Sequence, residues 1–278
     1  MISHRRAIFL AILLTAPRSS GTAAYRPAHT AAKAYDLWVD FEQDTIGSTM
    51  TARELAASSH GAKGTWVTSQ QAGLLTTRAD AQCPVHAVTG DAGTRGMQYS
   101  SSAGAISMII YNLPAEKNVV SIGLWYKTGA SYPWGEGPHF MSFFNPTHGP
   151  TMRLSDERDS LDNERQIRVS PENSGGTIGR VTGISDNTWY WVTMKFVKGS
   201  TGSLSVYDAS MDLVGTTTYV DGTNAAVTAV ELGNSHRTYP PNNYTVDFDD
   251  FEMDTTDAAF PLTPPQAGAA QKGTDRKK

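Results

Sequence analysis

The sequence predicts an all-β protein built as a two-sheet antiparallel β-sandwich or jelly roll. Hydrophobic residues make up 39% and charged residues 18% of the chain, with 25 glycines and 14 prolines, a composition typical of β proteins rich in turns. Two stretches, Val119–Lys127 and Trp189–Val197, carry apolar residues at every second position. This period of two indicates strands with one buried face. No stretch has a convincing amphipathic-helix pattern.

The N-terminus has the pattern of an export signal. A basic stretch at positions 4–6 precedes the apolar run Ala7–Leu14, and small residues follow. The run is too short to span a bilayer, and Pro17 would end an ordinary helix there. We therefore expect residues 1–34 to be a signal peptide and short leader, the protein to be exported to the periplasm, cell surface or medium, and the chain to have no membrane span.

The rest of the chain divides into one domain and a tail. Residues 35–262 are long enough to bury a sizeable core, and the single Cys83 cannot form an internal disulfide. Residues 263–278 are polar, have nothing to bury and are expected to be disordered. A net charge of −4 and a pI near 6.0 give no global attraction to nucleic acid. We expect no nucleic-acid partner, and we expect a monomer.

Short β patterns separated by turn residues fill the domain. The one helix-like patch is Thr51–Ser59. The weaker strand patterns are Gly64–Ser69, Gly96–Ser101, Ala105–Tyr111, Phe140–Asn145, Thr151–Ser155, Gln166–Ser170, Ser203–Asp208, Leu213–Val220 and Val227–Leu232. The predicted turns are Asn112-Leu113-Pro114, Asn145-Pro146, Ser170-Pro171, Lys198-Gly199-Ser200 and Asp221-Gly222.

The last strand, Tyr244–Met253, changes phase in its middle. Its apolar positions are even-numbered up to Phe248 and odd-numbered from Phe251 onward. An alternation of period two cannot change phase without an extra residue, so we expect a β-bulge near Asp249–Asp250. The segment Leu37–Glu42 repeats part of this pattern and is expected to pair with the last strand.

Several short stretches share their residues with a known superfamily. They are Asp40-Phe41-Glu42, Gly93–Tyr99, Val120–Lys127, Asn187–Val192, Val206-Tyr207-Asp208, Glu231-Leu232-Gly233 and Asp247–Phe251. Together they resemble the concanavalin A-like lectin/glucanase superfamily, including its laminin G-like bacterial members, over residues 35–262. The resemblance implies a curved jelly roll with its first and last strands side by side. Many relatives hold a structural calcium on the convex side and bind or cleave glycans on the concave side.

A structural calcium ion is the cofactor that this resemblance implies. Calcium takes six to eight oxygen ligands, which carboxylates from two distant segments can supply. In the implied fold, Glu42 with Asp249 or Asp250 forms the cross-strand set. The alternative interpretation is that these acids solvate an outer face and protect an edge strand.

The candidate glycan-binding residues lie on strand faces outside the core and in the loop Tyr132–His139. Sugars stack on flat aromatic rings and form hydrogen bonds with planar polar groups. The candidates are Trp125, Lys127, Trp134, His139, Arg153, Arg168, Trp191 and Lys195. The alternative is that the tryptophans pack inside the fold and the cationic side chains lie along its surface.

No catalytic motif is legible. The acidic stretch 156–164 contains Glu157 and Asp159 but lacks the third acid of a glucanase, and we interpret it as a charged loop. A polysaccharide lyase would use a His or Tyr base with an Arg or Gln neutralising a uronate. The leading hypothesis is an exported lectin-like module that binds a polysaccharide or glycoconjugate. The alternatives are a polysaccharide lyase or glycoside hydrolase with a diverged site on the concave sheet, and a structural or protein-binding domain.

Overall fold

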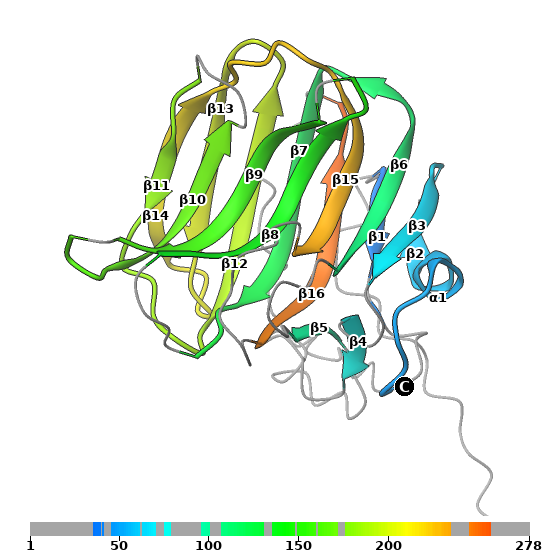
Figure 1. The fold of residues 1–278 in the computed structure, drawn as a ribbon, viewed down its shortest axis with the longest axis horizontal. Helices are drawn as coiled ribbons and strands as arrows, with labels where there is room; N and C mark the ends of the chain where they lie inside the picture. Colours follow the sequence, from blue (N-terminus) through cyan, green and yellow to red (C-terminus); the bar gives the residue numbers. More distant parts are fainter. Residues whose placement is uncertain are drawn as a thin grey trace, which may run out of the picture.

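The chain folds into two packed antiparallel β-sheets, as the computed structural model shows (Figure 1), which confirms the predicted fold class. The structure describes residues 36–39, 41, 46–61, 63–70, 75–78, 96–100, 107–130, 135–147, 149–159, 161–171, 176–234 and 245–256. The expected leader, the C-terminal tail and Cys83 lie outside these residues. Within the described part, no helix is long and apolar enough to cross a bilayer.

The described strands form one sheet of nine strands and one of seven. The nine-stranded sheet runs in the order β14 (Leu213–Val220), β13 (Thr201–Tyr207), β12 (Trp189–Val197), β7 (Val119–Lys127), β16 (Thr245–Asp254), β1 (Leu37–Val39) and β2 (Ser59–His60), with β5 (Gly96–Ser100) on β16 and β4 (Leu75–Arg78) on β5. The seven-stranded sheet runs β11 (Gly179–Val181), β10 (Arg165–Pro171), β9 (Gly149–Arg158), β8 (Gly135–Asn145), β15 (Val227–Asn234), β6 (Ser107–Lys117) and β3 (Thr65–Gln70).

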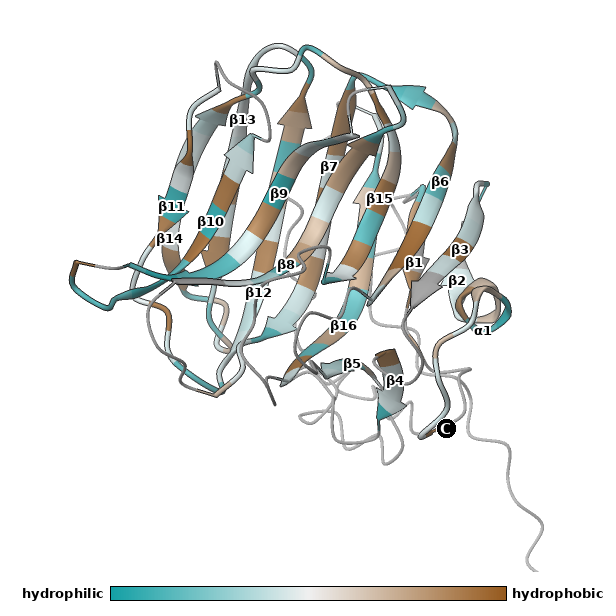
Figure 2. Ribbon diagram, viewed as in Figure 1, coloured by the Kyte–Doolittle hydropathy of each residue, from teal (hydrophilic) through white to brown (hydrophobic). Residues whose placement is uncertain are grey.

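The core lies between the inner faces of the two sheets. On β7 and β12 the predicted apolar sets are buried, and Figure 2 shows hydrophobic and hydrophilic bands alternating along the strands. Rings from opposite sheets meet there: the Tyr126 and Phe140 rings stack with centroids 4.1 Å apart, and Phe143 meets Phe196 edge-on at 5.5 Å. Burying each four-residue face contributes about 6–12 kcal/mol, an upper estimate because the unfolded chain is already partly compact.

The first and last strands pair, as the sequence predicts. Val39 of β1 lies opposite Phe251 of β16. On the other side of β16 the register against β7 shifts between Asp249 and Glu252, and Asp250 has a φ of 44°. Asp250 is therefore the extra residue that moves the apolar side chains from even to odd positions, and the predicted bulge is confirmed.

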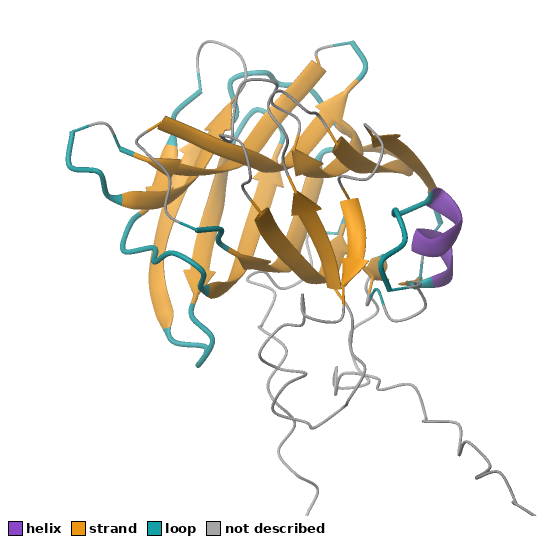
Figure 3. Cartoon of the chain, turned by 60° about the horizontal axis from the view of Figure 1, so that its bottom comes forward, coloured by secondary structure: helices purple, strands orange, loops and turns teal. Residues whose placement is uncertain are grey.

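A single helix in the described part, α1 (Ala52–Ala57), confirms the helix-like patch and lies at one edge of the sandwich (Figure 3). A capping box begins it. The Thr51 hydroxyl accepts the Glu54 backbone N–H at 3.2 Å, and the Glu54 carboxylate accepts the Thr51 backbone N–H at 3.0 Å. These reciprocal bonds satisfy donors that a short helix leaves without partners.

Three sequence predictions are wrong. The turn at Ser170-Pro171 does not form at those residues, because both lie in β10, opposite Arg153 and Met152 of β9. The turn at Asn112-Leu113-Pro114 does not form, because β6 continues to Lys117 and its register against β15 shifts over this stretch, where a proline is tolerated. The charged loop at 156–164 is shorter than predicted, because β9 extends to Arg158 and β10 begins at Arg165. Partners elsewhere in the fold stabilise the acidic end of β9.

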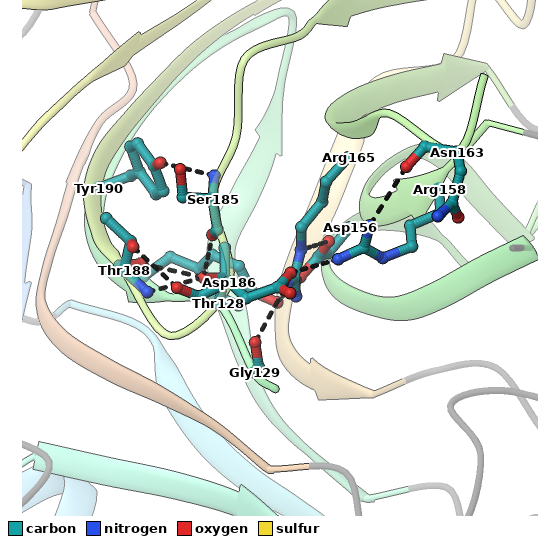
Figure 4. A network of polar contacts seen from close by, with 11 residues as sticks. Thr128, Gly129, Asp156, Arg158, Asn163, Arg165, Ser185, Asp186, Thr188 and Tyr190 are labelled. Carbon is teal, nitrogen blue, oxygen red and sulfur yellow. Dashed lines mark hydrogen bonds and ion pairs between the residues drawn. The ribbon is translucent and has the colours of Figure 1, made fainter. Parts of the chain in front are cut away.

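A buried polar network joins the two sheets at that end of the sandwich (Figure 4). The Arg165 guanidinium and the Asp156 carboxylate form a two-pronged ion pair, with Nε to Oδ1 at 2.7 Å, and their side chains are 1% and 0% exposed. Tyr126 of the opposite sheet donates its hydroxyl to Asp156 at 2.9 Å. Arg165 Nη1 also donates to the Gly129 carbonyl at 2.8 Å and to Asp186 at 2.6 Å. Asp156 is thus a structural acid inside the sandwich.

Candidate functional site

The predicted glycan-binding residues fall on two opposite outer faces of the sandwich. The outer face of the nine-stranded sheet carries Trp125, Lys127, Trp191 and Lys195. The outer face of the seven-stranded sheet carries His139, Arg153 and Arg168, and Trp134 lies outside the described residues. The sheets of a sandwich are about 10 Å apart, with the core between them. The two groups therefore cannot contact the same sugar.

The outer face of the nine-stranded sheet is built on a buried pair of tryptophans. Trp125 and Trp191 lie directly opposite each other on β7 and β12, with ring centroids 5.6 Å apart at 61°. Both are 0% exposed, and the Trp191 ring covers Gly123 so closely that a Cβ there would lie 2.5 Å from it. In the described part, neither indole Nε1 has an acceptor. In this arrangement the rings form a packed layer and present no open ring face to a sugar.

The lysines on this face differ in their contacts. Lys127 Nζ lies 3.2 Å from the Asp247 carboxylate and 5.9 Å from the centroid of the Trp189 ring. Asp247 also accepts from the Gln98 amide at 2.8 Å. Lys195 is half-buried on β12, and its backbone carbonyl accepts the Tyr219 hydroxyl at 2.7 Å. The ammonium group of Lys127 is thus engaged inside the protein.

The predicted metal acids lie at the β16 bulge. Asp249 and Asp250 are 0% and 1% exposed, and the Asp250 backbone N–H donates to Asp249 Oδ1 at 2.9 Å. Glu42 lies outside the described residues, and among the described ones no three potential metal-binding side chains converge. Adjacent carboxylates are the hard oxygen donors that calcium prefers, so the chemistry of Asp249 and Asp250 fits part of a calcium site.

The outer face of the seven-stranded sheet is a polar surface built on five neighbouring strands. Because directly opposed residues on paired strands point to the same side, the register defines its rows. One row is Glu231 (β15), Ser142 (β8), Arg153 (β9) and Ser170 (β10). The next is His139 (β8), Ser155 (β9), Arg168 (β10) and Arg180 (β11). A third contains Glu157 (β9) and Gln166 (β10).

Glu157 is held in one position by two neighbours on this face. Arg168 Nη1 lies 2.7 Å from Glu157 Oε2, and the Ser155 hydroxyl donates to Glu157 Oε1 at 2.6 Å. The Glu157 side chain is 7% exposed, whereas that of Arg168 is 20% exposed. The nitrogen Nε of Arg168 has no acceptor in the part of the chain that the structure describes. The guanidinium is therefore oriented by the protein, and its side chain remains partly exposed.

The carboxyl group of Glu231 has a pKa close to neutral pH. Glu231 is 7% exposed, and burial raises its pKa to about 7, although the positive charge of Arg153 acts in the opposite direction. Burial disfavours the charged carboxylate because the surroundings solvate it less well than water. Near pH 7 this carboxyl group is therefore present in both protonation states and can donate or accept a hydrogen bond.

Four residues of this face were not among the predicted site residues. The sequence places Glu157 in the predicted charged loop and predicts no site role for Gln166, Arg180 or Glu231. The alternation Ser155, Glu157 and then Gln166, Arg168 places polar side chains on one side of two consecutive strands, and this signal would have found Glu157 and Gln166. No local pattern in the sequence indicates that Glu231 is a site residue. Glu231 and Arg153 share a row only because β8 lies between β15 and β9 in the sheet.

Comparisons with known proteins find structural similarity at low sequence identity. No protein-family model matches the chain, and no curated protein matches its sequence. Among solved structures, the binding domain of botulinum neurotoxin serotype D matches with 12% identity and a TM-score of 0.47, over 80% of this chain and 48% of that one. This chain thus spans about half of the toxin structure. Cellulose induced protein Cip1 matches with 13% identity, a TM-score of 0.47 and coverage of 79% and 97%. The T. cruzi calreticulin globular domain matches with 10% identity, a TM-score of 0.44 and coverage of 69% and 84%.

Proposed function

We propose that this chain is an exported glycan-binding module of the concanavalin A-like type, and that it binds a polysaccharide or glycoconjugate on the outer face of the seven-stranded sheet. The observation that carries this proposal is the gathering of planar polar groups on that one face. Guanidinium, carboxylate, amide and imidazole groups form paired hydrogen bonds with neighbouring hydroxyls. They are supplied by His139, Arg153, Glu157, Gln166, Arg168 and Glu231.

The apolar residues beside this polar surface also suit a sugar. The row that contains Arg153 and Glu231 continues through Ile110 of β6 to Val67 of β3, which is 45% exposed. A sugar ring has an apolar face of C–H groups as well as hydroxyls. Aliphatic side chains at the end of a polar row can cover that face and exclude water, as the walls of ligand sites do.

The binding proposal predicts that Arg168→Gln weakens glycan binding about 10–100-fold, because a hydrogen bond to a charged group contributes about 1.5–3 kcal/mol. Binding is measured on a glycan array and then by calorimetry on the glycans that bind. Arg53→Gln is the matched control, since Arg53 is exposed on α1 at the edge of the sandwich. If folded Arg168→Gln and Arg153→Gln proteins bind glycan with unchanged affinity, this face is not the binding surface.

Glu231 favours one alternative function, a polysaccharide lyase or glycoside hydrolase. A carboxyl group with a pKa of about 7 in a polar site has the properties of a general acid or base. Release of reducing ends or of unsaturated uronate from a glycan that binds would establish catalysis. Loss of that release in Glu231→Gln, with binding retained, would assign the proton transfer to this residue. Binding without any product supports the lectin-like module.

We also propose that Asp249 and Asp250 contribute to a structural calcium site. EDTA is expected to lower the melting temperature by about 5–10 °C. Calcium at a hundred times its dissociation constant contributes about 2.7 kcal/mol, and each kcal/mol shifts the melting temperature of a domain of this size by about 2–4 °C. Added calcium should restore the curve, and Asp249→Asn should lose the response. A melting curve that EDTA leaves unchanged would exclude the site.

A further inference from the structure

Three arginines lie on three consecutive strands of the proposed binding face. Arg168 of β10 is directly opposite Arg180 of β11. Arg153 of β9 is opposite Ser170, two residues beyond Arg168, and so is the diagonal neighbour of Arg168. Directly opposed residues have Cβ atoms about 5 Å apart and diagonal ones about 7–8 Å. Like charges placed directly opposite each other destabilise a sheet, so this arrangement calls for negative charge nearby.

The acidic partners inside the protein lie deeper than the guanidinium groups. Glu157, which pairs with Arg168, is 7% exposed, whereas the Arg168 side chain is 20% exposed. Arg180 is 48% exposed and lies 3.6 Å from Asp159, whose side chain is 25% exposed. At 3.6 Å and with this exposure, the second pair is a weak one. A ligand that approaches this part of the face therefore meets guanidinium groups before it meets carboxylates.

We propose that the glycan bound on this face is acidic, with carboxylates of a uronic-acid polysaccharide paired to Arg153, Arg168 and Arg180, and that Glu231 competes with the ligand for Arg153. The proposal rests on the function proposed above and names its ligand class. The guanidinium fork matches a carboxylate with two parallel hydrogen bonds. Three such groups along one direction of the sheet suit a chain with repeated carboxylates.

The competition by Glu231 makes binding depend on pH. Ser142 of β8 lies directly opposite Glu231, Arg153 of β9 follows in the same row, and His139 of β8 lies in the next row. The flanking strand β6 contributes the uncharged Ile110 and Met108. Above a pKa of about 7 the Glu231 carboxylate attracts Arg153 and repels a ligand carboxylate. Below it Glu231 is neutral, so affinity for an acidic glycan rises as pH falls.

The test uses calorimetry on the full chain with hexamers of galacturonate, glucuronate, mannuronate and guluronate. Each hexamer is paired with its methyl ester, which has the same shape without the charge. At least one acidic hexamer is expected to bind about tenfold more tightly than its ester, the ratio that corresponds to about 1.4 kcal/mol. Its affinity is expected to increase several-fold from about pH 8 to about pH 6, across the range in which Glu231 loses its charge.

Variants separate the residues involved. Arg180→Gln should lower the affinity for the acidic hexamer several-fold and lower that for the ester much less, because the hydrogen bonds from a guanidinium to a charged carboxylate are the stronger ones. Glu231→Gln should retain tight binding at about pH 8 and lose most of the pH dependence, while Arg53→Gln should behave as the wild type.

Two results would overturn the proposal. One is equal or weaker binding of every acidic hexamer relative to its ester, including no binding of either. The other is an acidic preference that persists unchanged in Arg168→Gln and Arg180→Gln. A neutral glycan whose binding is lost in Arg168→Gln would overturn this inference and leave the proposed function standing. A chain that binds no glycan of any kind would overturn both.

Discussion

Arg165→Met is expected to lower the free energy of unfolding by about 3–5 kcal/mol, because it leaves the carboxylate of Asp156 buried without its counter-charge. Asp156 is 0% exposed between the sheets. Its two oxygens are held by Arg165 on the neighbouring strand and by the Tyr126 hydroxyl of the opposite sheet. Removing the guanidinium also removes the hydrogen bonds that Arg165 Nη1 donates to the Gly129 carbonyl and to Asp186. Chemical denaturation followed by circular dichroism measures the loss.

Arg180→Met is the matched control for this stability measurement. Arg180 also lies on the seven-stranded sheet, but it is 48% exposed and its ion pair with Asp159 is 3.6 Å long. Exposed pairs of this kind contribute about 0–1 kcal/mol. The double variant Arg165→Met/Asp156→Leu should recover part of the lost free energy of unfolding, because an apolar pair replaces the unpaired buried carboxylate. If Arg165→Met unfolds like Arg180→Met, the network does not stabilise the sandwich.

Trp191→Ala is expected to cost about 3–5 kcal/mol of stability, the range for removing a large buried aromatic side chain. Its ring is 0% exposed, lies over Gly123 and meets Trp125 edge-on. Trp191→Phe should cost less, because it keeps a ring in place and removes an indole N–H that has no acceptor among the described residues. Thermal melts of both variants measure the difference.

Glycan binding by the same variants tests the two outer faces against each other. Trp191→Phe is expected to bind glycan like the wild type, since Trp191 lies on the nine-stranded sheet. The contrary result is a stable Trp191→Ala or Trp191→Phe protein that has lost glycan binding. This result would show that the glycan binds on the outer face of the nine-stranded sheet, where the tryptophans lie. It would also show that the rings become accessible in solution.

Local alternation predicts the strands well where each strand has one apolar face. Val119–Lys127 and Trp189–Val197 match β7 and β12 at both ends. The phase change in Tyr244–Met253 predicts the bulge at Asp250, because period-two packing leaves no other way to keep both halves of the strand in the core. Prediction fails at the acidic end of β9, where Asp156 turns inward to partners that are distant in the sequence.

The sequence by itself determined the fold class, the strands with clean alternation, the bulge and the pairing of the first strand with the last. These properties depend on which side chains leave water, and the order of apolar residues records that directly. The tertiary structure decided which outer face each polar residue occupies. Alternation distinguishes inward from outward positions but is the same for both sheets, so it could not separate Trp125 and Trp191 from Arg153 and Arg168. The tertiary structure also decided the surroundings of Glu231, since the solvation of a carboxyl group depends on the strands packed around it.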